Sequence, residues 1–192
     1  ERNHSPAMEP TDGHPEQAVA LQGERASCDK GALRGGRGKG VLMIIGIVSD
    51  IHGHLSDEAH RALEGSDMIL CAGDTESPFA IMELEGIAPT IAVRGNCDRR
   101  DFGNPLPSLA SPLIGGVRFY LVHRPEDIGA IGDDVRVVVH GHTHRPREEY
   151  RGDVLYLNPG SPTDPRGGST KSVVRLVAND GRIDSVEFID VT

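Results

Sequence analysis

The chain has 192 residues and a mass of 20.6 kDa, which is enough for one domain with a substantial core and short for two. Its formal net charge of -9 argues against a general binder of nucleic-acid backbones, because such a protein needs a basic surface to gain affinity from counterion release. The acidity favours a bound cation as the attractor of any anionic substrate, although acidity that only aids solubility fits the charge equally well.

Residues 1–40 contain glycine, proline, serine and mixed charges, with almost no apolar periodicity. Such a segment cannot bury enough apolar surface to offset the entropy lost on ordering, so we predict a flexible, disordered N-terminal extension followed by one domain over 41–192. Met43 would then be the natural start of the protein. Alternatively, the basic cluster at 34–39 is a small arm for nucleic acid or a protein partner.

Apolar runs and capped helical segments alternate in the next part of the chain. The run at 41–48 is too short to cross a membrane and predicts a buried strand. Ser56 and Ser77 are expected N-caps, because a serine oxygen accepts a free backbone N–H at a helix start. The elements predicted here are strands at 41–48, 68–72 and 90–93 and helices at 56–64 and 77–85. Continuous apolar strands separated by helices are typical of a parallel sheet covered on both faces.

Beyond residue 106 the predicted strands follow one another more closely. They lie at 117–122, 135–139, 147–150, 154–157, 172–177 and 183–189, with a short helix at 126–131. The turn Asn179, Asp180 and Gly181 joins the last two as a hairpin. We therefore expect parallel units followed by mostly antiparallel strands. These strands are too many for one open sheet, so the predicted fold is α/β, with two facing mixed β-sheets flanked by helices.

The cysteine pattern indicates a reducing setting. Cys28, Cys71 and Cys97 are an odd number and show no CxxC spacing, so neither a disulfide framework nor a zinc ribbon is predicted. Cys71 lies in an apolar strand and is expected to serve packing. A cytoplasmic location fits these features best.

Polar residues follow five of the predicted strands, at the strand ends. These residues are Asp50 and His52, Asp74, Asn96 and Asp98, His123, and finally His140, His142 and His144. The carboxyl ends of parallel strands meet at one edge of a sheet, where functional groups collect. Carboxylate, carboxamide and imidazole groups together suit Mn, Fe, Zn or Ni ions. A pair of ions about 3.5–4 Å apart needs a bridging ligand, and Asp74 is the candidate because Gly73 allows a close approach of its loop.

Each of these short patterns also has an ordinary structural interpretation. Gly-Asp and Gly-Asn are common turn pairs, and a single histidine at a strand end is more often a hydrogen-bonded core or rim residue. The pair His142 and His144 is more specific, since two imidazoles separated by one residue in an extended loop can reach adjacent metals. The shared order along a strand and helix framework favours one common site.

The motifs SDIHG, AGD, RGNCD, LVH, GHTH and NPGS, over about residues 43–190, resemble those of the calcineurin-like metallophosphoesterase family, in particular its small prokaryotic phosphodiesterase branch. The resemblance implies the same two-sheet fold. It also implies that Asp50, His52 and His144 bind one metal, that Asn96, His123 and His142 bind a second, and that Asp74 bridges them.

The activity implied by this resemblance is hydrolysis of phosphodiesters, with phosphomonoesters as a weaker possibility. Two divalent metal ions, Mn²⁺ first and Ni²⁺, Fe²⁺ or Zn²⁺ as alternatives, would hold a hydroxide between them that attacks phosphorus. The expected partner is a small phosphoester substrate. No extended nucleic-acid surface and no membrane association are predicted, and a homo-oligomer is left open.

Two positions depart from the larger relatives. Cys97 stands where those relatives have a histidine assigned to protonation of the leaving group, so Asp98 or solvent becomes the candidate donor. Arg124 and Pro125 follow His123 where many relatives have Gly-His. Arg124 is a candidate clamp for a phosphate oxygen, with an ordinary solvated arginine as the alternative.

Further residues near these motifs have supporting roles in our interpretation. His54 and His140 are expected as hydrogen-bond partners of ligands or as ordinary loop and core histidines. The segment 158–161 is expected to form a tight turn below the site. The loops 98–111 and 164–170 are candidates for the entrance.

Two other functions remain open at this point. One is a scaffold that keeps the fold without chemistry, as in the eukaryotic retromer subunit of this family. The other is a nuclease, for which the acidic composition offers no groove.

Overall fold

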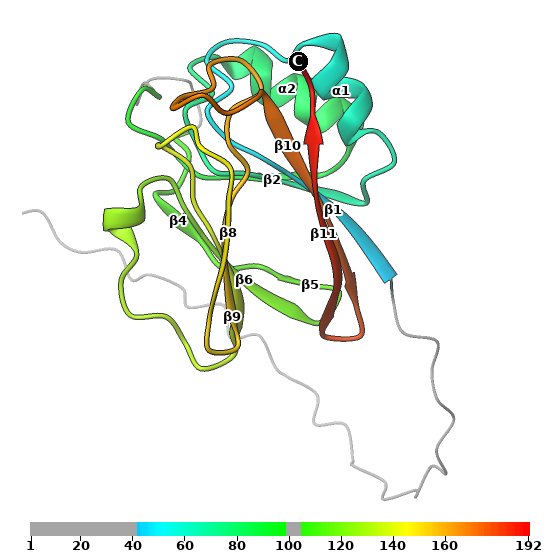
Figure 1. Ribbon diagram of the computed structural model, residues 1–192, viewed down its shortest axis with the longest axis vertical. Helices are drawn as coiled ribbons and strands as arrows, with labels where there is room; N and C mark the ends of the chain where they lie inside the picture. Colours follow the sequence, from blue (N-terminus) through cyan, green and yellow to red (C-terminus); the bar gives the residue numbers. More distant parts are fainter. Residues whose placement is uncertain (1–41, 99–104) are drawn as a thin grey trace, which may run out of the picture. The chain divides into compact units, whose positions relative to one another are not determined.

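The computed structural model describes residues 42–98 and 105–192, which form two β-sheets and two α-helices (Figure 1). The extension predicted over 1–40, Cys28 and part of the predicted entrance loop 98–111 lie outside the described residues.

The first sheet contains the predicted parallel unit and the C-terminal hairpin. Its strands, in spatial order, are β11 (Arg182–Asp190), β10 (Ser172–Asn179), β1 (Leu42–Val48), β2 (Met68–Cys71) and β3 (Thr90–Ala92). β1, β2 and β3 are parallel, as predicted, whereas β10 is antiparallel to both β1 and β11. Asp180 and Gly181, at φ 48° and 79°, form the turn that the sequence indicated.

Both predicted helices are present, with the predicted N-caps. α1 (Asp57–Leu63) begins after Ser56, whose side chain accepts the backbone N–H of Ala59, and α2 (Pro78–Ile87) begins after Ser77. The two helices lie together on one face of the first sheet (Figure 1), where Leu63 and Leu84 join the apolar cluster beneath them. No helix among the described residues is long and apolar enough to cross a membrane.

The second sheet is mixed, as predicted, and its centre is parallel. Its strands are β4 (Leu109–Ala110), β6 (Val117–Val122), β7 (Val135–Val139), β9 (Val154–Asn158) and β8 (Arg147–Arg151) in spatial order, and β5 (Leu113–Ile114) pairs with β6. β6, β7 and β9 are parallel, which the sequence did not predict, whereas β4 and β5 pair antiparallel with β6 and β8 pairs antiparallel with β9. β4 and β5 were not predicted, because strands of two residues carry no periodicity.

The helix predicted over 126–131 is instead a single 3₁₀ turn, η1 (Pro125–Asp127). Gly129 lies two residues after this turn, and its N–H donates to the Tyr120 hydroxyl. This interaction directs the backbone away from a helical path. Ile128 and Ile131 nevertheless pack on the outer face of the second sheet. Both α-helices of the described region therefore cover the first sheet, and a loop segment covers the second.

The main core lies between the two sheets. Ile45 and Ile47 of β1, Phe119 and Leu121 of β6 and Leu157 of β9 belong to one cluster and are fully buried. This packing joins the sheets with their parallel strands in reach of each other. It brings the loops that follow β1, β2, β3, β6 and β7 to one place.

Candidate metal centre

The structure brings together all seven residues that the resemblance assigned to metals. Asp50 and His52 follow β1, Asp74 follows β2, Asn96 follows β3, His123 follows β6, and His142 and His144 follow β7. They form two adjoining groups, one around His144 and one around His123.

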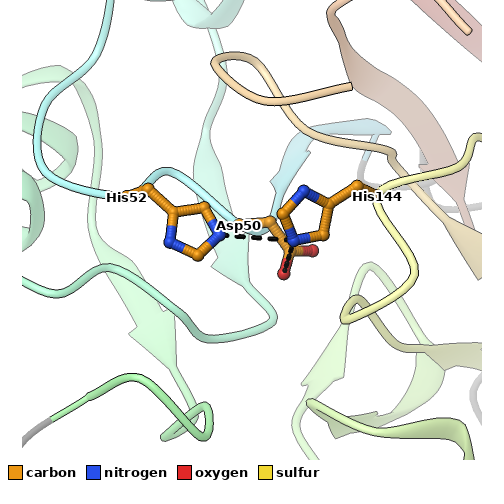
Figure 2. Close-up of side chains that lie close together, drawn as sticks. All are labelled: Asp50, His52 and His144. Atoms are coloured by element: carbon orange, nitrogen blue, oxygen red, sulfur yellow. Dashed lines mark hydrogen bonds and ion pairs between the residues drawn. The ribbon is translucent and has the colours of Figure 1, made fainter. Parts of the chain in front are cut away.

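In the first group the side chains of Asp50, His52 and His144 point toward one another (Figure 2). The Nε2 atom of His144 lies 3.2 Å from Oδ1 of Asp50 and 3.3 Å from Nε2 of His52. Asp50 and His144 are buried, and His52 is partly exposed. These atoms are close enough to share one ion.

The hydrogen bonds behind these rings determine what their Nε2 atoms offer. The Nδ1 atom of His144 donates to the carbonyl oxygen of Asp164 at 2.6 Å, because a carbonyl can only accept. In the neutral ring, Nε2 of His144 therefore carries a lone pair. Oδ1 of Asp50 is buried and has no hydrogen-bond donor among the described residues. Facing acceptors of this kind are stabilised by a cation between them.

The second group repeats this arrangement around His123. Its Nδ1 donates to the carbonyl oxygen of Ala72 at 2.7 Å. Its Nε2 faces Oδ2 of Asp74 at 3.2 Å and Oδ1 of Asn96 at 3.1 Å. The ring of His142 lies edge-on to that of His123, with the ring centroids 5.3 Å apart. Carboxylate, carboxamide and imidazole donors fit a second divalent ion.

The titration behaviour of these groups reflects burial and close pairing. Burial raises the pKa of Asp50. Burial also acts to raise the pKa of Asp74, but hydrogen bonds from His123 and from the backbone N–H of Cys97 outweigh it and hold that pKa well below its usual range. Burial acts to lower the pKa of His123, yet the bond to Asp74 raises it on balance. Without metal, a proton on His123 thus supplies the positive charge beside Asp74.

The backbone at the site is held in an unusual conformation. Five of the seven residues have left-handed φ angles, namely Asp50 (56°), His52 (50°), Asp74 (52°), His142 (68°) and His144 (55°). The other non-glycine residues with positive φ in the described region are Glu76 and Asp180. Such a conformation costs on the order of 1–3 kcal/mol per residue and concentrates at functional sites.

Three motif glycines allow the loops to approach this closely. A side chain at Gly95 would overlap the carboxylate and backbone of Asp74, and one at Gly141 would overlap the Ser49 hydroxyl. Gly73, with φ 88°, lies against the backbone of Gly95. Glycine at these points is therefore a packing requirement of the site.

Glu76 is a functional candidate that the sequence did not single out. Its Oε1 lies 2.8 Å from Nδ1 of His52, so that it orients this ring. Glu76 also has a left-handed backbone, with φ 58°. Its place two residues after Asp74 was the available signal, but a glutamate in a turn carries no specific pattern.

The segment 158–161 forms the supporting turn that was predicted. The Ser161 hydroxyl donates to the carbonyl oxygen of Asp50 at 2.7 Å, and the Thr163 hydroxyl donates to that of Ile51 at 2.9 Å. The Asn158 amide donates to the carbonyl oxygen of Gly141 at 2.9 Å. This turn ties the loops after β1 and β7 together beneath the ligands.

Asp98 braces the loops on the other side of the site. Its Oδ2 accepts the backbone N–H groups of Asp74 at 3.1 Å and Gly95 at 2.7 Å. Its Oδ1 accepts the Thr75 hydroxyl at 2.9 Å and the backbone N–H of Glu76 at 2.7 Å. Both carboxylate oxygens of Asp98 are therefore occupied by donors from the loops that carry the ligands.

The two other departures from the resemblance lie at the rim. Cys97 is a free cysteine on the exposed rim, and partial desolvation of its thiol together with the neighbouring carboxylates of Asp74 and Glu76 raises its pKa to about 12. The Nε of Arg124 donates to Oδ1 of Asn96 at 3.3 Å. Arg124 therefore lies beside the second group, and its role as a phosphate clamp stays a prediction.

His140 and His54 occupy different settings. His140 is buried, its ring contacts the Asn158 amide, and burial lowers its pKa. His54 is exposed in the loop after β1.

Two facing sheets with paired carboxylate and imidazole groups at their strand ends define a metal-dependent phosphoesterase. Residues 43–181 match the calcineurin-like phosphoesterase superfamily domain, and the chain belongs to this superfamily.

Relatives of known name are similar over most of their length. A probable metallophosphoesterase of Methanothermobacter thermautotrophicus is 33% identical over 161 residues, which cover 77% of this chain and 92% of the relative. The phosphodiesterase YfcE of Escherichia coli K12 is 33% identical over 159 residues, covering 68% and 85%. A solved structure of the E. coli phosphoesterase Yfce superposes with a TM-score of 0.59 and 28% identity, over 78% of this chain and all of that one.

Proposed function

We propose that this protein hydrolyses phosphodiester bonds with two bound divalent metal ions. The observation that carries the proposal is the convergence of imidazole, carboxylate and carboxamide atoms in both groups, around Nε2 of His144 and around Nε2 of His123. The superfamily makes the protein a phosphoesterase, and the name of the E. coli relative supports a diester as the substrate.

The residues divide between the two ions. Asp50, His52 and His144 would hold the first, Asn96, His123 and His142 would hold the second, and Asp74 would be shared between them. Bound ions of this kind activate water as a nucleophile and stabilise the charge on phosphoryl oxygens. We propose Mn²⁺ because nitrogen and oxygen donors without thiolate suit it, with Ni²⁺, Fe²⁺ and Zn²⁺ as alternatives.

The remaining residues position the ligands and the substrate. Three imidazoles are each held by their Nδ1 atom, which leaves Nε2 to bind an ion. The partners are the carbonyl oxygen of Asp164 for His144, the carbonyl oxygen of Ala72 for His123, and the carboxylate of Glu76 for His52. Arg124 places a positive charge beside Asn96, where it can contact a phosphoryl oxygen.

We assign no side chain to the protonation of the leaving group. Asp98 is occupied as a brace, and no histidine stands at the position of Cys97. Solvent then supplies this proton, so esters with good leaving groups react fastest.

The test is hydrolysis of bis(p-nitrophenyl) phosphate by the full chain with Mn²⁺, with chelator, and after Asp74→Ala or His142→Ala. We expect turnover that requires metal and falls at least a hundredfold in both variants, while His60→Ala on the surface of α1 retains it. Turnover that ignores chelator and both substitutions would overturn the mechanism. Full metal occupancy with no turnover on a broad phosphoester panel would favour a scaffold.

A further inference from the structure

A pocket of about 180 Å³ opens beside the second group of ligands. Two of the residues that line it, Asn96 and His123, belong to that group, and the others include Arg94, Ser108, Arg124 and Asp127. Because the pocket shares these two residues with the ligands, a phosphoryl group bound there would have one substituent at this pocket. Its described lining comes from two connections, the one between β3 and β4 and the one between β6 and β7.

The charge of the pocket is opposite to that of the protein. Among the lining residues that the structure describes, Arg94 and Arg124 are basic and Asp127 alone is acidic, although the whole chain carries a formal charge of -9. Within the described residues, neither guanidinium forms an ion pair with a carboxylate, and the side chain of Arg124 donates a hydrogen bond to the neutral amide of Asn96. Two guanidinium groups without carboxylate partners in a concave site attract an anion.

The other lining residues narrow the class of ligand. Ser108 and Asn96 add a hydroxyl and an amide, and the one ring among the described lining residues is the imidazole of His123. A nucleobase usually stacks on an aromatic face, and an acyl chain needs an apolar wall. A small, charged, oxygen-rich group suits this lining better than either.

We propose that this pocket binds a second anionic group of the substrate, a phosphate or a carboxylate carried by the substituent on the reacting phosphorus. The preferred substrates are then phosphodiesters with an additional negative charge a short distance from the bond that breaks. This inference rests on the proposed phosphodiesterase function and names its substrate class.

The kinetic test compares ethyl p-nitrophenyl phosphate with two analogues whose ethyl group carries a terminal carboxylate or a terminal phosphate. We expect kcat/KM with Mn²⁺ to be at least tenfold higher for one or both charged esters, mainly through a lower KM. The two charged arms show which anion the pocket prefers. In Arg94→Gln this preference should fall at least fivefold, with partial retention in Arg94→Lys, whereas Arg61→Gln on the exposed face of α1 should keep it.

A binding test separates this inference from catalysis. Calorimetry of the Mn²⁺-loaded chain should show about tenfold tighter binding of 2-carboxyethylphosphonate than of ethylphosphonate, with the difference lost in Arg94→Gln. If binding discriminates without turnover, the proposed hydrolysis fails while the pocket stands. Equal binding of the two phosphonates, binding of neither, or an unchanged preference in a folded Arg94→Gln protein would overturn the pocket assignment.

Discussion

The Nε2 atoms of His52 and His144 lie 3.3 Å apart, although each ring already uses its Nδ1 for another partner. Two neutral rings held in this way present lone pairs to each other, and Oδ1 of Asp50 adds a third acceptor. This mutual repulsion disappears when a cation lies between them, so the metal-free protein is expected to be the less stable form.

Addition of Mn²⁺ should therefore raise the melting temperature. Binding at about a hundred times the dissociation constant stabilises a protein by about 2.7 kcal/mol, which corresponds to roughly 5–10 °C for a domain of this size. Differential scanning fluorimetry with Mn²⁺ and with chelator measures the shift. His144→Ala should abolish most of it and His60→Ala should not, and an equal shift in both variants would contradict the assignment.

Glu76 should control metal affinity at the first group. Glu76→Ala removes the acceptor for Nδ1 of His52 and is expected to weaken Mn²⁺ binding about 10–100-fold. Glu76→Gln keeps an oxygen acceptor and should lose less. Metal titration by calorimetry gives the affinities, and Glu64→Ala, at the C-cap of α1, is the matched surface control. An unchanged affinity in Glu76→Ala would show that this contact does not orient the ring.

Asp98 should behave as a brace and not as a proton donor. Asp98→Ala leaves four donors without their acceptor and is expected to lower the free energy of unfolding by roughly 3 kcal/mol. Chemical denaturation measures this change. A proton donor would instead give unchanged stability and a selective loss of kcat on phenyl esters compared with p-nitrophenyl esters.

Two glycine substitutions should have opposite effects. Gly95→Ala forces a methyl group into Asp74, and we expect a loss of about 1–3 kcal/mol together with weaker metal binding. Gly86→Ala lies in α2 with open space around it and should stabilise the protein by about 0.5–1 kcal/mol through helix propensity. Thermal denaturation of both variants compares them directly, and similar behaviour would contradict the packing role of Gly95.

Stability should depend on pH in opposite directions with and without metal. The pKa of His123 is raised in the metal-free fold, so its contribution is fully present below the unfolded value of about 6.5 and is lost as pH rises through the folded pKa. Metal binding needs the unprotonated ring, so Mn²⁺ affinity should fall as pH drops through that same raised value.

Melting temperatures with chelator and with Mn²⁺ between about pH 5.5 and pH 8.5 test this relationship. In His123→Asn the contribution of this residue to the metal-free trend should disappear. If the metal-free and Mn²⁺-loaded forms of the unmodified protein change in stability in the same direction with pH, the predicted opposite dependence is wrong.

The local signals in the chain were sufficient for most of the elements and for the composition of the site. Ser56 and Ser77 correctly predicted the starts of their helices, because an N-cap side chain accepts backbone N–H groups only two or three residues away. The seven candidate ligands lie at strand ends in short motifs, and the family resemblance of these motifs was sufficient to assign them to two metals.

Features that depend on contacts between distant segments needed the fold. Apolar periodicity reports which face of a strand is buried but not which strand lies beside it, so the parallel pairing of β6, β7 and β9 was missed. Asp98 and Glu76 acquire their roles from partners more than twenty residues away, and Ser161 reaches Asp50 across 111 positions. Residue types specify which atoms can bind a metal, whereas the packing of two sheets decides which of them meet and in which tautomer.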